Sequence, residues 1–215
     1  MTTTPDAVQG GRRLRNMRDK QSRIFEAAAA LFAEHGFASV TTQQISERAD
    51  VAAGTLFRYA ASKGELLLMV CNEEFRAALD QGERDAKAES DPSRAVLAMT
   101  RPILEAADQH VENTVAYQRE LLFGAPTEQY RAKGLATVAR LESMIAERLT
   151  AAVTLRDADP KAVFARALLA GRSVFAVLHL ILARPSTGAH SGRDAIDDLR
   201  DQITQIVAGF FASVE

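Results

Sequence analysis

The sequence of 215 residues contains one cysteine and no tryptophan, and these shortages exclude several classes of protein. Cys71 cannot form an internal disulfide or a multi-cysteine metal site, so disulfide-stapled and zinc-ribbon folds are excluded. The four histidines do not have metal-ligand spacing, and we expect no metal or other cofactor. Residues 1–11 are small and polar and lack the apolar core of a signal peptide, so we expect a cytoplasmic protein.

Long hydrophobic runs are also missing. The longest strongly apolar stretch without a formal charge runs from Ser173 to Ala183, between Arg172 and Arg184. A helix that crosses a bilayer needs roughly 20 such residues. We therefore expect no membrane span and no membrane partner.

Common catalytic motifs are absent as well. The sequence contains no G-x-S-x-G, no G-x-G-x-x-G, no P-loop and no H-E-x-x-H pattern, so we expect no enzyme. It also lacks internal repeats and hairpin dipeptides between alternating strands. Apolar residues recur instead with helical spacing almost everywhere, which predicts an all-α fold.

Charge is distributed unevenly along the chain. The whole sequence carries 26 basic and 28 acidic side chains, a net charge of −2. Residues 1–63 hold nine basic and six acidic side chains, a net of +3, which leaves −5 for the remainder. A basic N-terminal part on an acidic body is typical of a DNA-binding unit joined to a sensing or assembly domain, although a charged surface is often only solvated.

The N-terminal part predicts three short helices. A helix from Arg18 is expected to end at Gly36, and Thr41 or Thr42 caps a second one. Residues 50–54 interrupt the pattern before residues 55–59 resume it. The apolar face of the first two helices comprises Ile24, Ala27, Ala28, Leu31, Phe32, Ile45 and Ala49.

The remainder predicts longer helices. Ser62 and Glu65 have the spacing of a capping box at the start of a helix that reaches about Gln81. Residues 82–91 either continue that helix or form a linker. Another helix opens at Asp91-Pro92, with a kink expected at Pro102. Further helices are expected after residues 124–127, over 160–184 and from about residue 193.

The segments 23–37, 41–59 and 62–63 together resemble the DNA-binding domain of the TetR family of bacterial transcriptional regulators. Their sequences are RIFEAAAALFAEHGF, TTQQISERADVAAGTLFRY and SK. The resemblance implies a basic flexible arm at 1–17, a three-helix helix-turn-helix domain at 18–63, and a helical-bundle ligand-binding and dimerisation domain at 64–215. It covers about 45 residues, and beyond them the family has no common sequence pattern.

Three positions depart from the usual family pattern. Asp50 replaces the glycine before the turn valine, but aspartate tolerates a left-handed conformation, so we expect the turn to be kept. Ala60 replaces an aromatic core residue. Gly64 replaces an acidic residue and weakens the start of the next helix.

By this resemblance, the second helix of the helix-turn-helix lies in the major groove of double-stranded operator DNA. The small residues at its start make few hydrogen bonds to bases. Specificity for the DNA sequence is therefore expected to depend on Gln43, Arg58 and DNA shape. Thr42, Tyr59 and Lys63 correspond to phosphate contacts. The complete set of expected DNA-binding residues is Thr42, Gln43, Ala52, Ala53, Gly54, Thr55, Arg58, Tyr59 and Lys63.

The helix over 161–184 is apolar on nearly every face, so a second copy of the chain is its expected cover. The resemblance agrees, since family members usually dimerise through their last two long helices. The expected homodimer interface comprises Phe164, Leu168, Val174, Leu178, Ile181, Leu199, Ile203, Ile206 and Phe210.

A cavity for an unidentified small-molecule effector is expected among the helices between about residues 96 and 175. Its aliphatic and phenylalanine-rich lining favours an apolar or amphipathic ligand. The expected lining comprises Phe75, Met99, Ile103, Tyr117, Phe123, Tyr130, Met144 and Phe175, with His110 and His179 as polar anchors.

These expectations combine into a dimeric one-component regulator, a repressor that the ligand releases from a palindromic operator. Two alternatives remain open at this point. One is a helical adaptor that binds protein through its N-terminal domain, and the other is a regulator that answers to a protein and not to a small molecule.

Overall fold

The computed structural model describes residues 5–154, 159–190 and 192–214, with side chains from residue 15 onward. Within these ranges the secondary structure is helical and contains no strand, so the predicted all-α fold is confirmed. The helices are α1 (Pro5–Ser39), α2 (Thr42–Arg48), α3 (Ala53–Leu56), α4 (Lys63–Ala86), α5 (Pro92–Asp108), α6 (Val111–Phe123), α7 (Gln129–Ala151), α8 (Pro160–Leu182), α9 (Arg184–Thr187) and α10 (Ala195–Val214).

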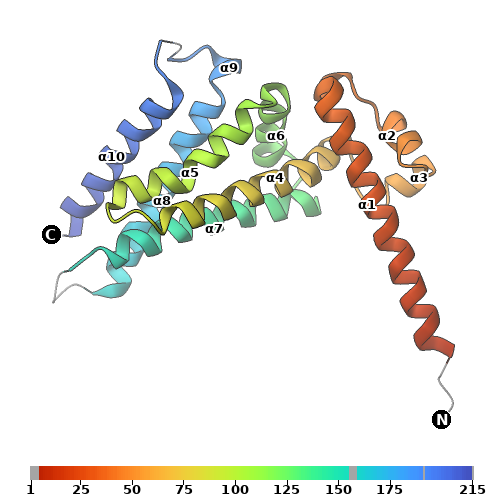
Figure 1. Cartoon of the computed structure of the whole chain (residues 1–215), viewed down its shortest axis with the longest axis horizontal. Helices are drawn as coiled ribbons and strands as arrows, with labels where there is room; N and C mark the ends of the chain where they lie inside the picture. The colour runs from red at the N-terminus through yellow and green to blue at the C-terminus, as the bar shows by residue number, and fades with distance from the viewer. Residues whose placement is uncertain (1–4, 155–158, 191, 215) are drawn as a thin grey trace.

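The molecule has two unequal parts (Figure 1). Helices α1 to α3, here called the head, lie at one end. Helices α4 to α10, here called the body, form an elongated bundle in which α4 runs alongside α5 and α7, and α8 packs against both α7 and α10. The first turns of α4 reach into the head, so this helix belongs to both parts in packing terms.

Helix α1 is longer than the sequence predicted. It begins at Pro5 and not at Arg18, so most of the segment expected to be a flexible arm continues this helix. The side chains of Arg12 and Arg13 lie outside the described ones, whereas Arg15 and Arg18 are exposed. Gly36 has φ 76° and ψ 160°, which interrupts the helix at the residue where it was predicted to end.

The body contains two boundaries that the sequence pattern located poorly. Helix α4 starts as predicted, because the Ser62 side chain accepts a hydrogen bond from the Glu65 backbone, but it continues to Ala86. The chain also breaks between α5 and α6, where His110 precedes the first residue of α6. No glycine or proline marks that break, so no local pattern predicted it.

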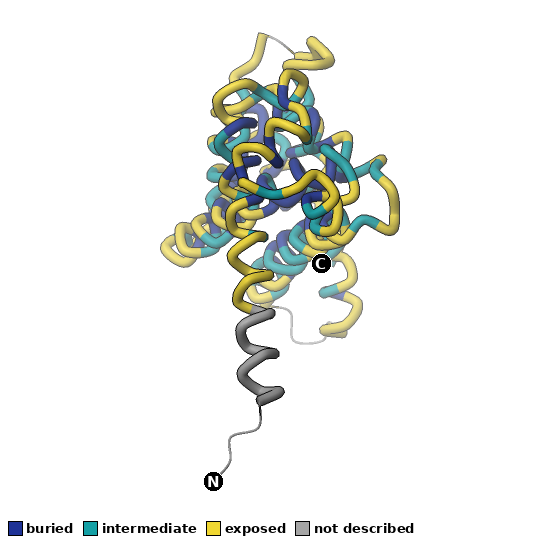
Figure 2. Tube along the Cα trace, turned by 90° about the vertical axis from the view of Figure 1, so that its right-hand side faces the viewer, coloured by how far each residue is buried: buried dark blue, intermediate teal, exposed yellow. Residues whose placement is uncertain are grey.

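Two hydrophobic clusters hold the structure together. One lies inside the body and includes Leu141, Ile145 and Ile203. The other fills the head, and it also contains residues 66–70 of α4, Ala116 and Leu121 of α6 and Tyr130 of α7. Buried residues accordingly lie in the interior of both parts, while the described N-terminal turns of α1 are exposed (Figure 2). The head therefore depends on the body for part of its core.

Helix α8 is the longest apolar segment in the part of the chain that the structure describes. By length and composition alone it could cross a membrane, as many core helices could. The buried residues of α8, including Val174 and Leu178, pack inside the cluster of the body.

Candidate functional site

The head contains a helix-turn-helix whose local geometry follows from its sequence. Thr41 caps α2: its hydroxyl accepts from the Gln44 backbone at 3.2 Å, and the Gln44 carboxamide accepts from the Thr41 backbone at 2.8 Å. The turn after α2 places Asp50 at φ 50°, the left-handed conformation that this residue was expected to tolerate. Ile45 and Leu56 are fully buried and fix α2 against α3.

Most of the residues expected to contact DNA are accessible. Gln43, Arg58 and residues 52–54 are exposed, whereas Thr42, Thr55 and Tyr59 are half-buried. A Cβ added at Gly54 would meet nothing within 4 Å, so the start of α3 is open to a partner. The Arg58 side chain makes no hydrogen bond or ion pair with any residue that the structure describes. The start of α3 and the Arg58 side chain are therefore accessible to a partner.

Tyr59 and Lys63 have structural contacts within the chain. The Tyr59 hydroxyl donates to the Met17 carbonyl at 3.2 Å. The Lys63 ammonium donates to the carbonyls of Phe37 and Val40, both at 2.9 Å, and lies 4.3 Å from the centroid of the Phe37 ring. The Lys63 bonds stabilise the end of α1, and the Tyr59 bond joins residue 59 to the middle of the same helix. The role of both residues as phosphate contacts stays a prediction.

A cavity of about 80 Å³ lies in the body between α4, α5, α6 and α8. Five of the residues expected to line a ligand cavity lie around it, together with His110. These five are Phe75, Ile103, Tyr117, Phe175 and His179.

The other four expected lining residues lie elsewhere. Phe123 is 81% exposed at the end of α6, and Tyr130 is buried with the residues of the head. Met99 and Met144 line a separate groove with Glu83 and Arg148. Helical periodicity identifies apolar positions but not the neighbouring helix that each one faces, so these four assignments were wrong for this cavity.

Polar residues that sequence reasoning had missed contribute to the cavity wall. Gln118 donates to the His179 carbonyl at 2.8 Å and lies 3.1 Å from His179 Nδ1. Burial lowers the pKa of His179. The Tyr117 hydroxyl donates to Asn72 Oδ1 at 2.9 Å. Burial raises the pKa of the Cys71 thiol, which therefore stays protonated and unreactive.

Asn113 joins the cavity to the head. It lines the cavity and is 7% exposed, yet its carboxamide accepts from the Phe37 backbone at 2.8 Å and donates to the Phe32 carbonyl at 2.9 Å. Neighbouring Glu112 accepts from the Ala38 backbone at 2.6 Å. The first turn of α6 thus holds the end of α1 and lines the cavity at once. An asparagine in an amphipathic helix gave no sequence signal for this bridge.

The helices expected to form a dimer place many of the expected interface residues inward. Val174, Leu178, Ile181, Leu199, Ile203 and Phe210 are buried within the chain. Phe164, Leu168 and Ile206 are partly buried against the same cluster. The large apolar side chains that α8 exposes are instead Leu169 at 59% and Leu180 at 68%. For the buried six, the interface prediction is corrected, because α8 and α10 bury them against each other and against α5 and α7.

Metal-ligating side chains do not gather anywhere in the described part of the chain. No group of three His, Cys, Asp or Glu residues there lies close enough to hold an ion.

Comparison with known proteins places the head in a family. Residues 24–70 match the family model described as bacterial regulatory proteins, tetR family. The chain is 32% identical over 106 residues to the HTH-type transcriptional repressor KstR of Mycolicibacterium smegmatis, which covers 49% of this chain and 52% of that protein. It is 30% identical over 146 residues to KstR of Rhodococcus jostii, covering 66% of this chain and 63% of that protein. The chain therefore spans about half to two thirds of the length of these relatives.

A solved structure shares the fold of most of the chain. The Thermus thermophilus FadR, a TetR-family transcriptional repressor in complex with lauroyl-CoA, superposes with a TM-score of 0.67 at 23% identity. The match covers 87% of this chain and 93% of that one. The capped helix-turn-helix and its match to the family model agree, so residues 24–70 form a segment of the kind found in bacterial regulatory proteins of the tetR family.

Proposed function

We propose that this chain is a DNA-binding transcriptional repressor that acts as a homodimer and leaves a palindromic operator when a small ligand binds its body. The observation that carries the proposal is the capped helix-turn-helix, whose α3 start is open and whose Gln43 and Arg58 are exposed. Small residues at the start of α3 allow the backbone to approach the bases closely, and Arg58 supplies a donor for bases or phosphates.

A second copy of the chain is the proposed cover for α8. Exposed Leu169 and Leu180 are about three helical turns apart, so they lie on one face, which also carries exposed Ala165 and Ala176. Exposed Ser173 and Arg172 lie on or beside the same face, so the apolar residues form a stripe with a polar edge, as association surfaces do. Pairing two bodies would present two heads to two half-sites, and this multiplies their separate affinities.

The effector is proposed to occupy the cavity of the body. Support comes from its apolar walls and from the bridge that Asn113 makes to the head. A volume of about 80 Å³ is smaller than the roughly 300–1,000 Å³ of sites for drug-sized ligands. A ligand must therefore be small or must widen the cavity, and widening at α6 would disturb the bonds to α1.

A regulator that answers to a protein is the second candidate. The small volume of the cavity is the observation that favours it.

Capture of genomic DNA fragments tests the proposal. The full chain is mixed with fragments from its source over a salt series, beside Arg58→Ala and the control Arg101→Ala. Both arginines are exposed, but Arg101 lies on α5 in the body. We expect the wild type and the control to enrich one palindromic site with binding that weakens steeply with salt, and Arg58→Ala to lose it. Failure of the wild type to enrich any site would contradict the proposal.

A further inference from the structure

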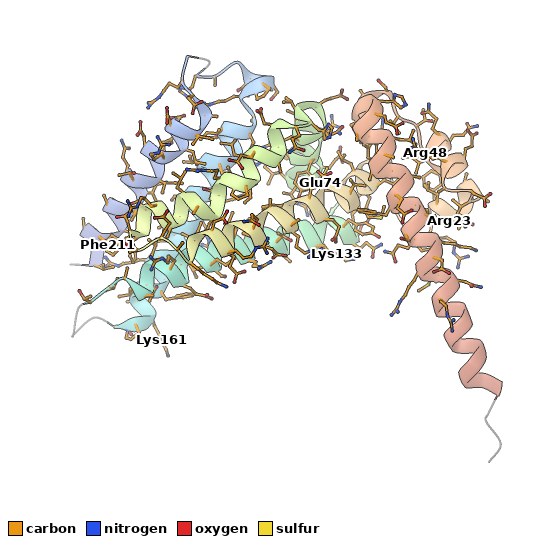
Figure 3. All side chains as sticks on the ribbon, viewed as in Figure 1. Arg23, Arg48, Glu74, Lys133, Lys161 and Phe211 are labelled. Carbon is orange, nitrogen blue, oxygen red and sulfur yellow. The ribbon has the colours of Figure 1, made fainter. Side chains whose placement is uncertain are left out.

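The polar lining of the cavity is unusual in its charge. Among the described residues that surround it, Glu74 is the single carboxylate and there is no lysine or arginine. Glu74 lies on α4, on the side that faces α6 (Figure 3). An anionic group buried in this cavity would meet a like charge and find no fixed cation to pair with.

Most other polar groups of the wall already have partners within the chain. Asn113 is bound to the backbone of the head, Tyr117 to Asn72, and Gln118 to His179. The Thr114 hydroxyl donates to the Ala107 carbonyl at 2.8 Å. The carboxylate of Glu74, by contrast, has no hydrogen bond or ion pair to any residue in the part of the chain that the structure describes. It remains available as an acceptor.

The surroundings of Glu74 strengthen its preference for a donor. Glu74 is exposed at the edge of the cavity, yet neighbouring atoms of the wall desolvate its carboxyl enough to raise its pKa, with His110 nearby acting in the opposite direction. A carboxylate that has lost part of its hydration gains more from a hydrogen-bond donor or a cation than an exposed one does. The apolar residues Phe75, Ile103, Leu178 and Leu182 lie around the same space.

From this arrangement we infer that the cavity takes an apolar ligand whose polar end lies at the exposed edge of the cavity and donates a hydrogen bond to Glu74, as an alcohol or an amine does, and that it disfavours a carboxylate. The inference rests on the proposed function only in treating this cavity as the effector site. It narrows the ligand from any amphipathic molecule to one whose polar end is neutral or cationic.

Three ligands of one chain length test the inference: octan-1-ol, octylamine and octanoate. Their binding to the full chain is measured by isothermal titration calorimetry at pH 7.5, below the concentrations at which they form micelles. Octylamine is cationic and octanoate is anionic at this pH, so the Glu74 carboxylate attracts the first and repels the second. We expect octylamine to bind with a Kd about tenfold or more below that of octanoate, and octanol to lie between them.

Glu74→Gln is the diagnostic variant, and Glu105→Gln is its matched control. Glu105 is also exposed and lies on α5, outside the wall of the cavity. Glutamine keeps a carbonyl acceptor but removes the charge, so Glu74→Gln should weaken octylamine and strengthen octanoate, each by about tenfold, and leave octanol within about twofold. Glu105→Gln should change none of the three. A thermal melt by circular dichroism verifies that each variant is folded.

Equal binding of octanoate and octylamine to the wild type would overturn the inference. So would identical behaviour of the two variants, or no binding of any of the three ligands up to about 1 mM. None of these results would touch the proposed binding of DNA, which the Arg58→Ala capture experiment decides separately.

Discussion

The head and the body of this protein are both built from amphipathic helices, but the surfaces that these helices leave exposed differ. In the head, apolar residues form a small core and leave short, exposed residues on α3 facing outward. In the body, longer helices enclose a cavity and leave an apolar face on α8 uncovered. These surfaces are the basis for the proposal that the head binds DNA and that the body binds a small ligand and a second copy of the chain.

The two parts are nevertheless joined through one core. Leu66 and Leu67 of α4 are fully buried in the cluster of the head, and Asn113 of α6 holds the end of α1. The contrast between the parts is thus one of surface and function, and their stability is shared.

The largest expected effect comes from breaking the shared core. Leu67→Ala should lower the free energy of unfolding by about 2–5 kcal/mol, because it leaves a void between the head and α4. Hydrogen exchange should then rise in the head and in α4 together. Ile203→Ala, a matched void in the body cluster, should give a similar loss in denaturant unfolding at the same protein concentration. If Leu67→Ala increased amide hydrogen exchange in the body alone and left the head unchanged, the head and the body would have separate cores.

A smaller effect is expected where two helices of the body touch through a glycine. A Cβ at Gly82 would lie 2.3 Å from the Met99 carbonyl oxygen, so Gly82→Ala must push α4 and α5 apart and should cost about 1–3 kcal/mol of stability. In the head, Gly54→Ala meets open space within a helix and should stabilise by up to about 1 kcal/mol. Thermal unfolding of the two variants measures the difference, and equal changes would contradict this view of the packing.

The bridge between cavity and head offers a third test. Asn113→Ala leaves the Phe37 amide and the Phe32 carbonyl without their partner, at a cost of about 1–3 kcal/mol. Exchange of the Phe37 amide should accelerate. Gln118→Ala removes another buried amide of the same helix, but its bonds are to His179 and not to the head. Amide exchange at Phe37 should be unchanged in that control. Faster exchange in both variants would contradict the view that Asn113 in particular holds the end of α1.

The smallest effect is expected from His179. Burial lowers its pKa below the ordinary value of 6.5, so the unfolded chain binds its proton at a higher pH than the folded chain does. The contribution of this residue to stability is present above pH 6.5 and is lost as the pH falls through that value towards the folded pKa. Denaturant unfolding between pH 8 and 5 should therefore show a steeper loss for the wild type than for His179→Gln. Parallel profiles would contradict the assigned burial effect.

The sequence predicted the head better than the body for a physical reason. Caps, turn residues and the left-handed position at Asp50 are local, so the pattern around them indicates each role directly. Which side of α8 faces inward depends on where α5, α7 and α10 lie, and no local pattern contains that information. Val174 and Leu178 were therefore assigned to an interface although they lie in the core, while the pattern did not distinguish Leu169 and Leu180 as the exposed leucines of α8.

Polar residues were hardest to predict. Glutamate and asparagine are common at solvated helix positions, so nothing in the sequence distinguishes Glu74 and Asn113. They line the cavity only because α4 packs against α6. Lys63 shows the reverse case, because a residue assigned to DNA by resemblance also binds carbonyls at the end of α1.

The central claim is that two heads act together because two bodies associate through α8. Its most direct test compares the affinity of the full chain for a captured palindromic site and for a single half-site, in the wild type, Leu180→Glu and the exposed control Phe123→Glu. The wild type and the control should bind the palindrome about 100-fold more tightly than the half-site, whereas Leu180→Glu should bind the two alike. Equal affinities of the wild type for both duplexes would contradict the account.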